Sequence, residues 1–150
     1  MRLEPKDANF EFRIRSGFGT QGFMRHVGAY LEVLEPGRCI IAADFHEQLA
    51  QRHGYFHGGL IGSLADDAGG YAVCTLIAPE QSVLTVEYKV SFLAPAIGSK
   101  LRAVGQVIRF GRSLSVAESK VFALSDSQES LCAVALVTMK AVRREERRHS

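Results

Sequence analysis

An aspartate set among glycines is the feature of this sequence most suggestive of chemistry. Residues 57–77 read HGGLIGSLADDAGGYAVCTLI, with two charged residues in twenty-one, and Pro79 follows closely. An apolar run of this length that ends before a proline predicts one long helix. On a helical wheel, Asp66 points directly away from an apolar stripe that we expect to be buried. That stripe consists of Leu60, Ile61, Leu64, Ala68, Tyr71 and Ala72.

The helix face around Asp66 gathers residues that rarely share a solvated surface, namely Gly59, Gly62, Gly69, Gly70 and Val73. Glycine inside a helix costs roughly 0.5–1 kcal/mol relative to alanine, so close approach of another backbone or a ligand is expected here. We expect a sheet on one side of the helix and a second helix on the other. Asp66 would then be partly buried, with a raised pKa suited to general-base or nucleophilic work. The alternative is an exposed face with a solvated carboxylate, but such faces usually carry Lys, Glu and Arg. Asp67, about 100° further round the helix, is expected to be solvated or part of a capping network.

The start of the helix is a second candidate for chemistry. His57-Gly58-Gly59 opens it, where the first amide N–H groups lack intrahelical partners and glycine lets a substrate approach them. This is a natural oxyanion site. Gly58 and Asp66 are eight residues apart, hence about 12 Å along one helix axis, so they cannot contact the same carbonyl group. If they cooperate, one comes from each of two chains related by a two-fold axis.

Other chemistries find less support in the residues. His53 and His57 have the i, i+4 spacing of some zinc helices, but Gly54 places His53 in a loop and no HExxH motif is present, so no metal site is predicted. Ser63 lacks the GxSxG elbow of a serine hydrolase. Cys74 is expected to be a packed thiol, and the three cysteines show neither CxxC spacing nor a disulfide framework.

The remaining elements predict an α+β fold. Residues 17–27 are predicted to form a short helix, 29–34 and 39–45 a hairpin about a Pro-Gly turn, and 46–56 a loop. Beyond the long helix we expect consecutive antiparallel strands at 83–92, 100–110, 113–124 and 131–142. In the first of these strands, alternation places Leu84, Val86, Tyr88, Val90 and Phe92 on one face and Thr85, Glu87, Lys89 and Ser91 on the other.

Composition limits the class of protein. The 150 residues fit one domain, and 47% hydrophobic content excludes disorder of the body. The net charge of +2 equals the charge of the charged tail, 143–150, so a neutral body argues against nucleic-acid or anionic-membrane partners. Residues 1–16 are expected to form an irregular N-terminal arm, without the apolar segment of a signal peptide. No run approaches the roughly 18 apolar residues of a membrane span, so a cytoplasmic protein is predicted.

Four short segments carry a resemblance to a known family. The segment QRHGYFHGG at 51–59, followed by Leu64-Ala65-Asp66, resembles the hotdog-fold thioesterases of the phenylacetate-degradation (PaaI-type) branch, within the 4-hydroxybenzoyl-CoA thioesterase superfamily. VLTVEYKVSFLAPA and GRSLSVAESKVFA are also similar to that group, and the likeness spans roughly residues 28–142. It implies five to six antiparallel strands around one central helix and edge-to-edge dimers, often paired into tetramers. It also implies hydrolysis of acyl-CoA without metal or cofactor.

The resemblance implies a role for each matching residue. Asp66 corresponds to the catalytic carboxylate and Gly58 to the residue whose backbone N–H polarises the thioester carbonyl. Gln51 falls where members use Asn or Gln to position the carbonyl or the water. His57 corresponds to a histidine beside the helix start that orients rather than acts as base, and Thr85 to a hydroxyl residue that helps hold the water.

Substrate contacts are expected in a pocket between two subunits. Its predicted lining is the Asp66 helix face, Gly59 and the Tyr55–Phe56 loop, with Phe18 and Phe23. Arg112-Ser113 lies where members contact the pantetheine or the nucleotide phosphates of CoA.

The function that follows is acyl-CoA thioester hydrolysis, with Asp66 as general base or as a nucleophile that forms an anhydride. Two alternatives stay open. One is a non-catalytic hotdog protein that binds acyl-CoA as a sensor or carrier, because fold alone does not decide function. The other is a dehydratase or hydratase of a β-hydroxyacyl or enoyl thioester.

Overall fold

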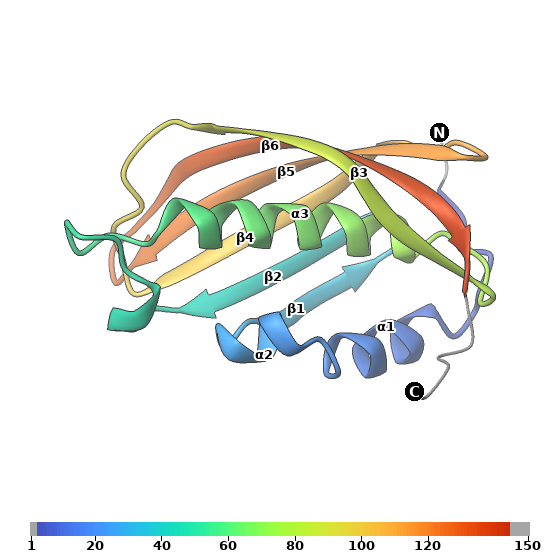
Figure 1. The fold of residues 1–150 in the computed structure, drawn as a ribbon, viewed down its shortest axis with the longest axis horizontal. Helices are drawn as coiled ribbons and strands as arrows, with labels where there is room; N and C mark the ends of the chain where they lie inside the picture. Colours follow the sequence, from blue (N-terminus) through green and yellow to red (C-terminus); the bar gives the residue numbers. More distant parts are fainter. Residues whose placement is uncertain (1–2, 145–150) are drawn as a thin grey trace.

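A curved six-stranded sheet wraps around one long helix in the computed structural model, which describes residues 3–144 (Figure 1). The long helix is α3 (Gly58–Cys74), and the predicted α+β hotdog architecture is confirmed. The other helices are α1 (Phe10–Phe18), α2 (Gly22–His26) and the 3-10 turn η1 (Glu47–Leu49). The strands are β1 (Tyr30–Glu35), β2 (Arg38–Asp44), β3 (Gln81–Phe92), β4 (Lys100–Arg109), β5 (Leu114–Ser125) and β6 (Gln128–Arg143).

Helix α1 departs from the sequence prediction, which expected an irregular arm over residues 1–16. Phe10, Ile14 and Phe18 recur every four residues, so they form one apolar stripe on a helix. Ile14 and Phe18 are buried in the main core and Phe10 packs against it. Helix α1 therefore lies along one side of α3 as part of the domain (Figure 1).

The strands are antiparallel, in the order β1-β2-β4-β5-β6-β3. Strands β1 and β2 form the predicted hairpin, and β4, β5 and β6 are consecutive neighbours. Strand β3 is not beside β4 but pairs with β6, so it forms one edge of the sheet. Helix α3 connects β2 with β3 across the concave face, which places the two strands far apart in the sheet (Figure 1).

The helix lies very close to the sheet because small residues face each other. Ala65, Ala68 and Ala72 of α3 are completely buried, and a Cβ at Gly105 of β4 would clash with the backbone carbonyl of Ala68. The Ser119 hydroxyl of β5 donates a 2.7 Å hydrogen bond to the carbonyl oxygen of Ala65. This bond ties the middle of the helix to the middle of the sheet.

We predicted that a second helix would cover the glycine face of α3, but strands of the sheet cover Gly62 and Gly69. A Cβ at Gly62 would lie 3.4 Å from the Tyr88 hydroxyl of β3, and one at Gly69 would lie 3.1 Å from Val137 of β6. The sheet curves far enough to contact both sides of the helix, so its own strands fill the space expected for a neighbour. Gly59 remains exposed and Gly70 half-buried, on either side of Asp66.

Strand β3 contains a bulge that changes which side chains face the helix. Its register against β6 shifts between Thr85 and Glu87. Thr85 bonds to Asp66 of α3, and Tyr88, three positions later, lies against Gly62. Uninterrupted alternation would put residues three apart on opposite faces, so the prediction that Thr85 faces away from Tyr88 is wrong.

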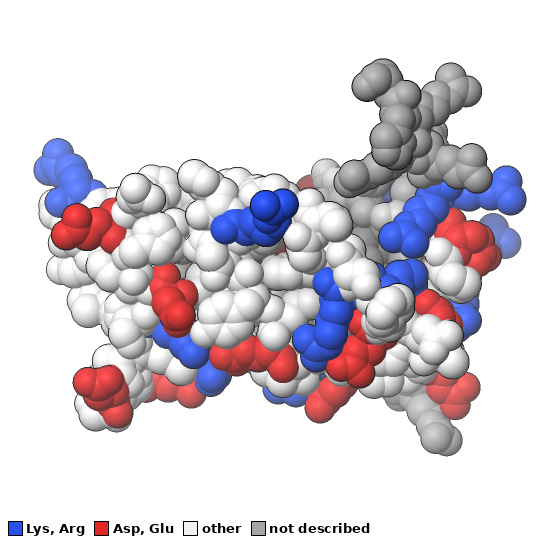
Figure 2. All heavy atoms as spheres, turned by 90° about the horizontal axis from the view of Figure 1, so that it is seen from below, with Lys and Arg blue, Asp and Glu red and all other residues white. Residues whose placement is uncertain are grey.

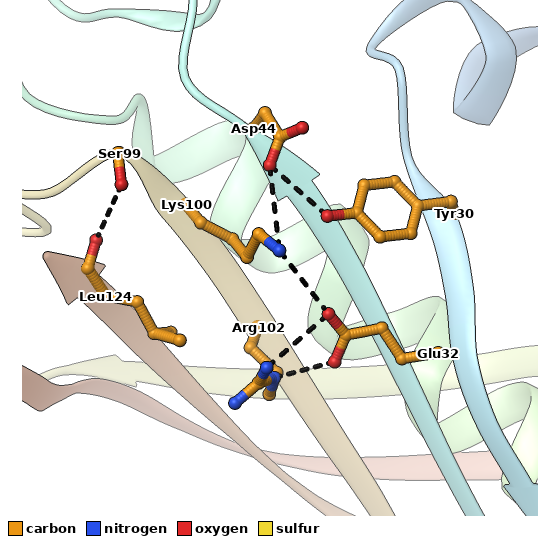
Figure 3. Close-up of polar contacts among 7 residues, drawn as sticks. All are labelled: Tyr30, Glu32, Asp44, Ser99, Lys100, Arg102 and Leu124. Carbon is orange, nitrogen blue, oxygen red and sulfur yellow. Dashed lines mark hydrogen bonds and ion pairs between the residues drawn. The ribbon is translucent and has the colours of Figure 1, made fainter. Parts of the chain in front are cut away.

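Charged residues fasten the other edge strand, β1, to the sheet (Figure 3). Arg102 of β4 reaches across β2 and donates a 2.7 Å hydrogen bond to Glu32 of β1. Lys100 lies 3.7 Å from Glu32 and 3.9 Å from Asp44, and the Tyr30 hydroxyl donates to Asp44 at 3.2 Å. The cluster balances two cations against two carboxylates.

Basic and acidic side chains are mingled on the face seen in Figure 2, where no extended area of one sign stands out. Among residues 3–144, no helix is long and apolar enough to cross a membrane. The predicted tail at 143–150 falls mostly outside the described residues, since only Arg143 and Arg144 belong to them.

Candidate active site

Asp66 lies halfway along α3 with its carboxylate held by the neighbouring strand. The Thr85 hydroxyl donates a 2.7 Å hydrogen bond to Asp66 Oδ1. Burial raises the pKa of Asp66, and the hydrogen bond from Thr85 partly offsets this by stabilising the charged form. Both residues line a cavity of about 340 Å³ between α1, α3 and the first half of β3. A half-buried carboxylate in a cavity, with one oxygen fixed, is suited to accept a proton from water.

Asp67 lines the same cavity, which corrects the expectation of a solvated residue. Its Oδ2 is buried and has no hydrogen-bond partner among the described residues. Burial is the main cause that raises the pKa of Asp67 to about 7, and the charge of Asp66 adds to it. A side-chain hydrogen bond with Gln21 acts to lower this pKa. The prediction failed because α1 and the residues after it cover this flank of α3.

Several residues that line this cavity were not predicted to do so, among them Arg13, Gln21 and Tyr71. Arg13 is engaged by Asp7 at 2.7 Å and by the carbonyl oxygen of Cys74 at 3.2 Å. Gln21 Nε2 donates a 3.0 Å hydrogen bond to the Tyr71 hydroxyl. The four-residue spacing of apolar residues in α1 was the signal that could have predicted a helix on this side of the cavity.

The first turn of α3 leaves one amide available. The N–H of Gly59 donates to His57 Nδ1 at 2.8 Å, so His57 caps the helix with its own side chain. The N–H groups of Leu60 and Ile61 donate to the His57 carbonyl oxygen at 3.0 and 3.2 Å. Within residues 3–144, the Gly58 N–H has no partner, and it is the amide that an incoming carbonyl oxygen could engage.

A second cavity, of about 450 Å³, lies beside this helix start. It is lined by Gln51, Tyr55, Phe56, Gly58, Ile61, Phe92, Leu93, Ala94, Pro95 and Ala96. Gln51 Oε1 accepts a hydrogen bond from the His53 backbone N–H, and its Nε2 amide has no hydrogen-bond acceptor among residues 3–144. Phe56 is buried and packs edge-to-face on Phe45, with ring centroids 5.1 Å apart.

A single protomer does not bring all the predicted site residues together. Asp66 and Thr85 line the first cavity, whereas Gln51 and Gly58 line the second, with Tyr55 and Phe56. This division agrees with their separation along α3 of about 12 Å. Each cavity thus holds one half of the predicted chemistry.

Other candidates lie apart from both cavities. Arg112 and Ser113 are exposed in the turn between β4 and β5. Phe18 is buried against Tyr71, with ring centroids 5.5 Å apart, and Phe23 is exposed. Neither lines the two cavities of one protomer. In the described part of the chain, no three His, Cys, Asp or Glu side chains form a group able to hold a metal ion.

Comparisons with known proteins agree with the fold and the sequence pattern. The family model described as Thioesterase superfamily matches residues 53–130. The solved structure of a thioesterase family protein from Silicibacter pomeroyi is 35% identical, with a TM-score of 0.88 over 90% of this chain and 99% of that one. A protein from Saccharolobus solfataricus is 36% identical over 112 residues, which are 75% of this chain and 72% of that protein. The 1,4-dihydroxy-2-naphthoyl-CoA hydrolase of Listeria monocytogenes is 26% identical over 118 residues, which are 79% of this chain and 94% of that enzyme.

Proposed function

The chain belongs to the thioesterase superfamily, and from this membership we propose that it hydrolyses acyl-CoA thioesters to a free acid and CoA. The observation that carries the proposal is the Asp66 carboxylate, half-buried in a cavity and fixed by Thr85. A thioester carbonyl is electrophilic and a thiolate leaves readily. One carboxylate and two hydrogen bonds to the carbonyl oxygen therefore suffice for hydrolysis.

In the proposed reaction, a water molecule between Asp66 and the carbonyl carbon is the nucleophile. Asp66 accepts a proton as the water oxygen bonds to carbon, and the carbonyl oxygen becomes an oxyanion. The oxyanion then re-forms the carbonyl of the free acid as the C–S bond breaks, and the sulfur leaves as the CoA thiol after it takes the proton that Asp66 accepted. Attack by Asp66 itself, through an anhydride that water cleaves, leads to the same products.

The oxyanion in this scheme accepts a hydrogen bond from the Gly58 N–H, and Gln51 Nε2 positions the carbonyl or the water. His57 caps the helix and so holds the Gly58 amide in place. Tyr55, Phe56 and Gly59 lie around the thioester, and Arg112 and Ser113 contact the CoA. We assign the protein to the phenylacetate-degradation branch and to the cytoplasm.

The proposed site is shared by two copies of the chain. Its support is the separation of the Asp66 cavity from the Gly58 cavity within one protomer. Edge strand β3 runs between them and exposes Leu84, Val86 and Phe92, each more than half accessible. Edge-to-edge pairing of two such strands would cover these side chains and bring the Asp66 of one protomer to the helix start of the other.

Release of free thiol from a panel of acyl-CoA thioesters tests the function. The panel holds acetyl, hexanoyl, lauroyl, phenylacetyl and 4-hydroxybenzoyl thioesters, and the wild type is compared with Asp66→Asn. We expect turnover of at least one thioester and a loss of at least about a hundredfold in the variant. Asp126→Asn, in the exposed turn between β5 and β6, is the matched control. Absence of turnover on every thioester would refute the proposal in favour of an acyl-CoA-binding protein.

A further inference from the structure

We propose that Arg13 and Arg144 form a carboxylate-binding subsite, through which the protein selects acyl groups whose far end is a carboxylate. The inference rests on the proposed thioesterase function, because it takes the cavity at Asp66 as the place of the acyl group. It concerns the end of that cavity away from Asp66, where α1, the end of α3 and the residue after β6 all contribute to the lining.

The cavity at Asp66 extends along α3 toward the C-terminal end of the helix. Asp66 and Cys74 both line it, and they are eight residues apart, about 12 Å along the helix axis. Strand β3 runs beside the helix in the opposite direction, because Tyr88 lies against Gly62 whereas Thr85 bonds to Asp66. The start of β3 therefore accompanies the end of α3, and one long cavity joins the reacting carboxylate to a second, separate end.

Two guanidinium groups line the Cys74 end of the cavity. Arg13 belongs to α1, and Arg144 directly follows β6. Burial raises the pKa of Cys74 to about 12, whereas the charges of Arg13 and Arg144 act to lower it, so both cations lie near this thiol. The backbone N–H of Arg144 donates a 2.8 Å hydrogen bond to the Glu80 carbonyl oxygen, which fixes Arg144 beside the start of β3.

The two cations differ in how far they are already neutralised. Arg13 Nε donates to Asp7 at 2.7 Å and Arg13 Nη2 donates to the Cys74 carbonyl oxygen at 3.2 Å, which leaves further N–H donors on this guanidinium. Within residues 3–144, no carboxylate forms an ion pair with Arg144. Since the Arg13–Asp7 pair is neutral, Arg144 gives this end of the cavity a net positive charge. A carboxylate is the group that two guanidinium donors fit best.

Strand β3 supplies further polar groups at the same end, because Gln81 and Ser82 also line the cavity. Gln81 Oε1 accepts a hydrogen bond from the Ala78 N–H at 3.2 Å, and its Nε2 amide has no acceptor among residues 3–144. A carboxylate accepts several hydrogen bonds at once. The amide of Gln81 therefore adds a donor to those of the two arginines.

The acidic groups of the cavity lie at its opposite end. Asp66 and Asp67 precede Cys74 by eight and seven residues, which places them about 10–12 Å away along the helix. A carboxylate on the acyl group is repelled by Asp66 and attracted by the arginines. This difference directs the uncharged thioester toward Asp66 and so orients the substrate for hydrolysis.

The distance between the two ends sets the length of the acyl group. An extended chain gains about 1.2 Å per bond, so six to eight carbons span about 6–9 Å between their end carbons. The ion pair adds about 4 Å, which brings the total close to the length of the cavity. A volume of about 340 Å³ holds about eleven water-sized atoms at roughly 30 Å³ each. A six-carbon acyl group with a terminal carboxylate fits this space.

The test compares kcat/KM for adipoyl-CoA and hexanoyl-CoA, whose acyl groups have equal numbers of carbons and differ in the terminal carboxylate. We expect the wild type to prefer adipoyl-CoA by about tenfold or more, because its contact with Arg144 is charge-assisted. Arg144→Ala should reduce that preference about tenfold through slower turnover of adipoyl-CoA, and Arg144→Lys should retain part of it. Arg143→Ala is the matched control, because it removes the same charge from a residue that lines neither cavity, and it should keep the wild-type preference.

Arg13 is tested without leaving Asp7 as an unpaired charge. The double variant Asp7→Asn, Arg13→Gln removes both members of the ion pair and so keeps the net charge of the protein. It should lower the preference for adipoyl-CoA about threefold or more. If loss of the Arg13 bond to the Cys74 carbonyl oxygen unfolds this variant, the Arg144 variants still decide the question.

Binding separates this inference from the proposed function. Dissociation constants for adipoyl-CoA and hexanoyl-CoA are measured in an Asp66→Asn background, with and without Arg144→Ala. A preference for adipoyl-CoA that disappears with Arg144→Ala supports the inference even if the wild type turns over no thioester. Equal affinity for the two compounds, a preference that Arg144→Ala retains, or an equal loss in Arg143→Ala would overturn it while leaving any hydrolysis intact.

Discussion

The hydroxyl of Thr85 donates a 2.7 Å hydrogen bond to Oδ1 of Asp66, and the β-bulge in β3 makes this contact possible. Without the extra residue between Thr85 and Glu87, the alternation that directs Tyr88 and Phe92 toward α3 would direct Thr85 away from it. The bond occupies one carboxylate oxygen and leaves the other for a water molecule. The bulge therefore orients the group to which we assign proton transfer.

Removal of the Thr85 hydroxyl is expected to shift the pH dependence of hydrolysis. The hydrogen bond stabilises ionised Asp66 and lowers its pKa, so Thr85→Ala raises that pKa further. Because the base must be ionised, the acidic limb of kcat/KM moves to higher pH. Thr85→Ser retains the hydroxyl and should keep the wild-type profile. Identical profiles in Thr85→Ala and wild type would show that this bond does not act on the essential base.

Asp67 is expected to make the folded state less stable as pH rises. Its pKa is about 7 in the folded protein and 3.8 as the ordinary value, so the folded state holds a proton that the unfolded state has lost between these limits. Stability from this group is complete below about pH 4 and is lost as pH rises through about 7, by a few kcal/mol. Asp67→Asn should match wild type most closely in urea unfolding at about pH 4 and exceed its stability at pH 8. A variant less stable than wild type at pH 8 would contradict this account.

His57 is expected to act through the helix cap rather than as a base. His57→Ala removes the acceptor for the Gly59 N–H and should cost about 1 kcal/mol of unfolding free energy. Asn is a strong capping residue, so His57→Asn should recover most of that stability. It should also keep kcat/KM near the wild-type value, measured on the best thioester of the panel. A loss of about a hundredfold in both variants would instead assign His57 a direct role in the reaction.

Most helices and strands follow from the local sequence pattern. The predictions that failed concern features set by contacts between segments far apart in the chain. Helix α3 was predicted because its apolar run, glycine start and following proline act locally, and the structure starts it at Gly58 with His57 as the cap. The bulge at Thr85 depends on the register between β3 and β6, whose paired residues lie about fifty positions apart in the chain. Sequence alternation alone does not contain that register.

The candidate site shows the same difference between local and long-range information. The spacing between Gly58 and Asp66 already showed that one helix cannot hold both groups at one carbonyl, and the two cavities agree with it. Asp67 was assigned to solvent because the helical wheel describes only the helix itself. Its burial is set by α1, which packs on that flank through Ile14 and Phe18.

Helix α3 and strand β4 lie in close contact at Gly105, so one added methyl group there is expected to lower the stability of the fold strongly. Gly105→Ala places a Cβ against the carbonyl group of Ala68, and neither backbone can retreat without breaking sheet or helix bonds. We expect a loss of about 3 kcal/mol or more in urea unfolding. Gly22→Ala is the control, because a Cβ there meets nothing within 4 Å, and it should change stability by less than about 0.5 kcal/mol. Equal stabilities of the two variants would mean that the helix lies further from β4 than described.

A mixture of two inactive variants tests whether the site is shared. Gln51→Ala and Asp66→Asn lie in different cavities of one protomer, so in a shared site each variant damages a different half. A dimer with one subunit of each kind has one site with both groups intact and one with neither. After random exchange half of the dimers are mixed, so thiol release should recover to about a quarter of the wild-type rate. Each variant taken alone through the same exchange is the control and should stay inactive. If both groups act within one protomer, every subunit in the mixture carries one lesion, and no activity returns at any mixing ratio.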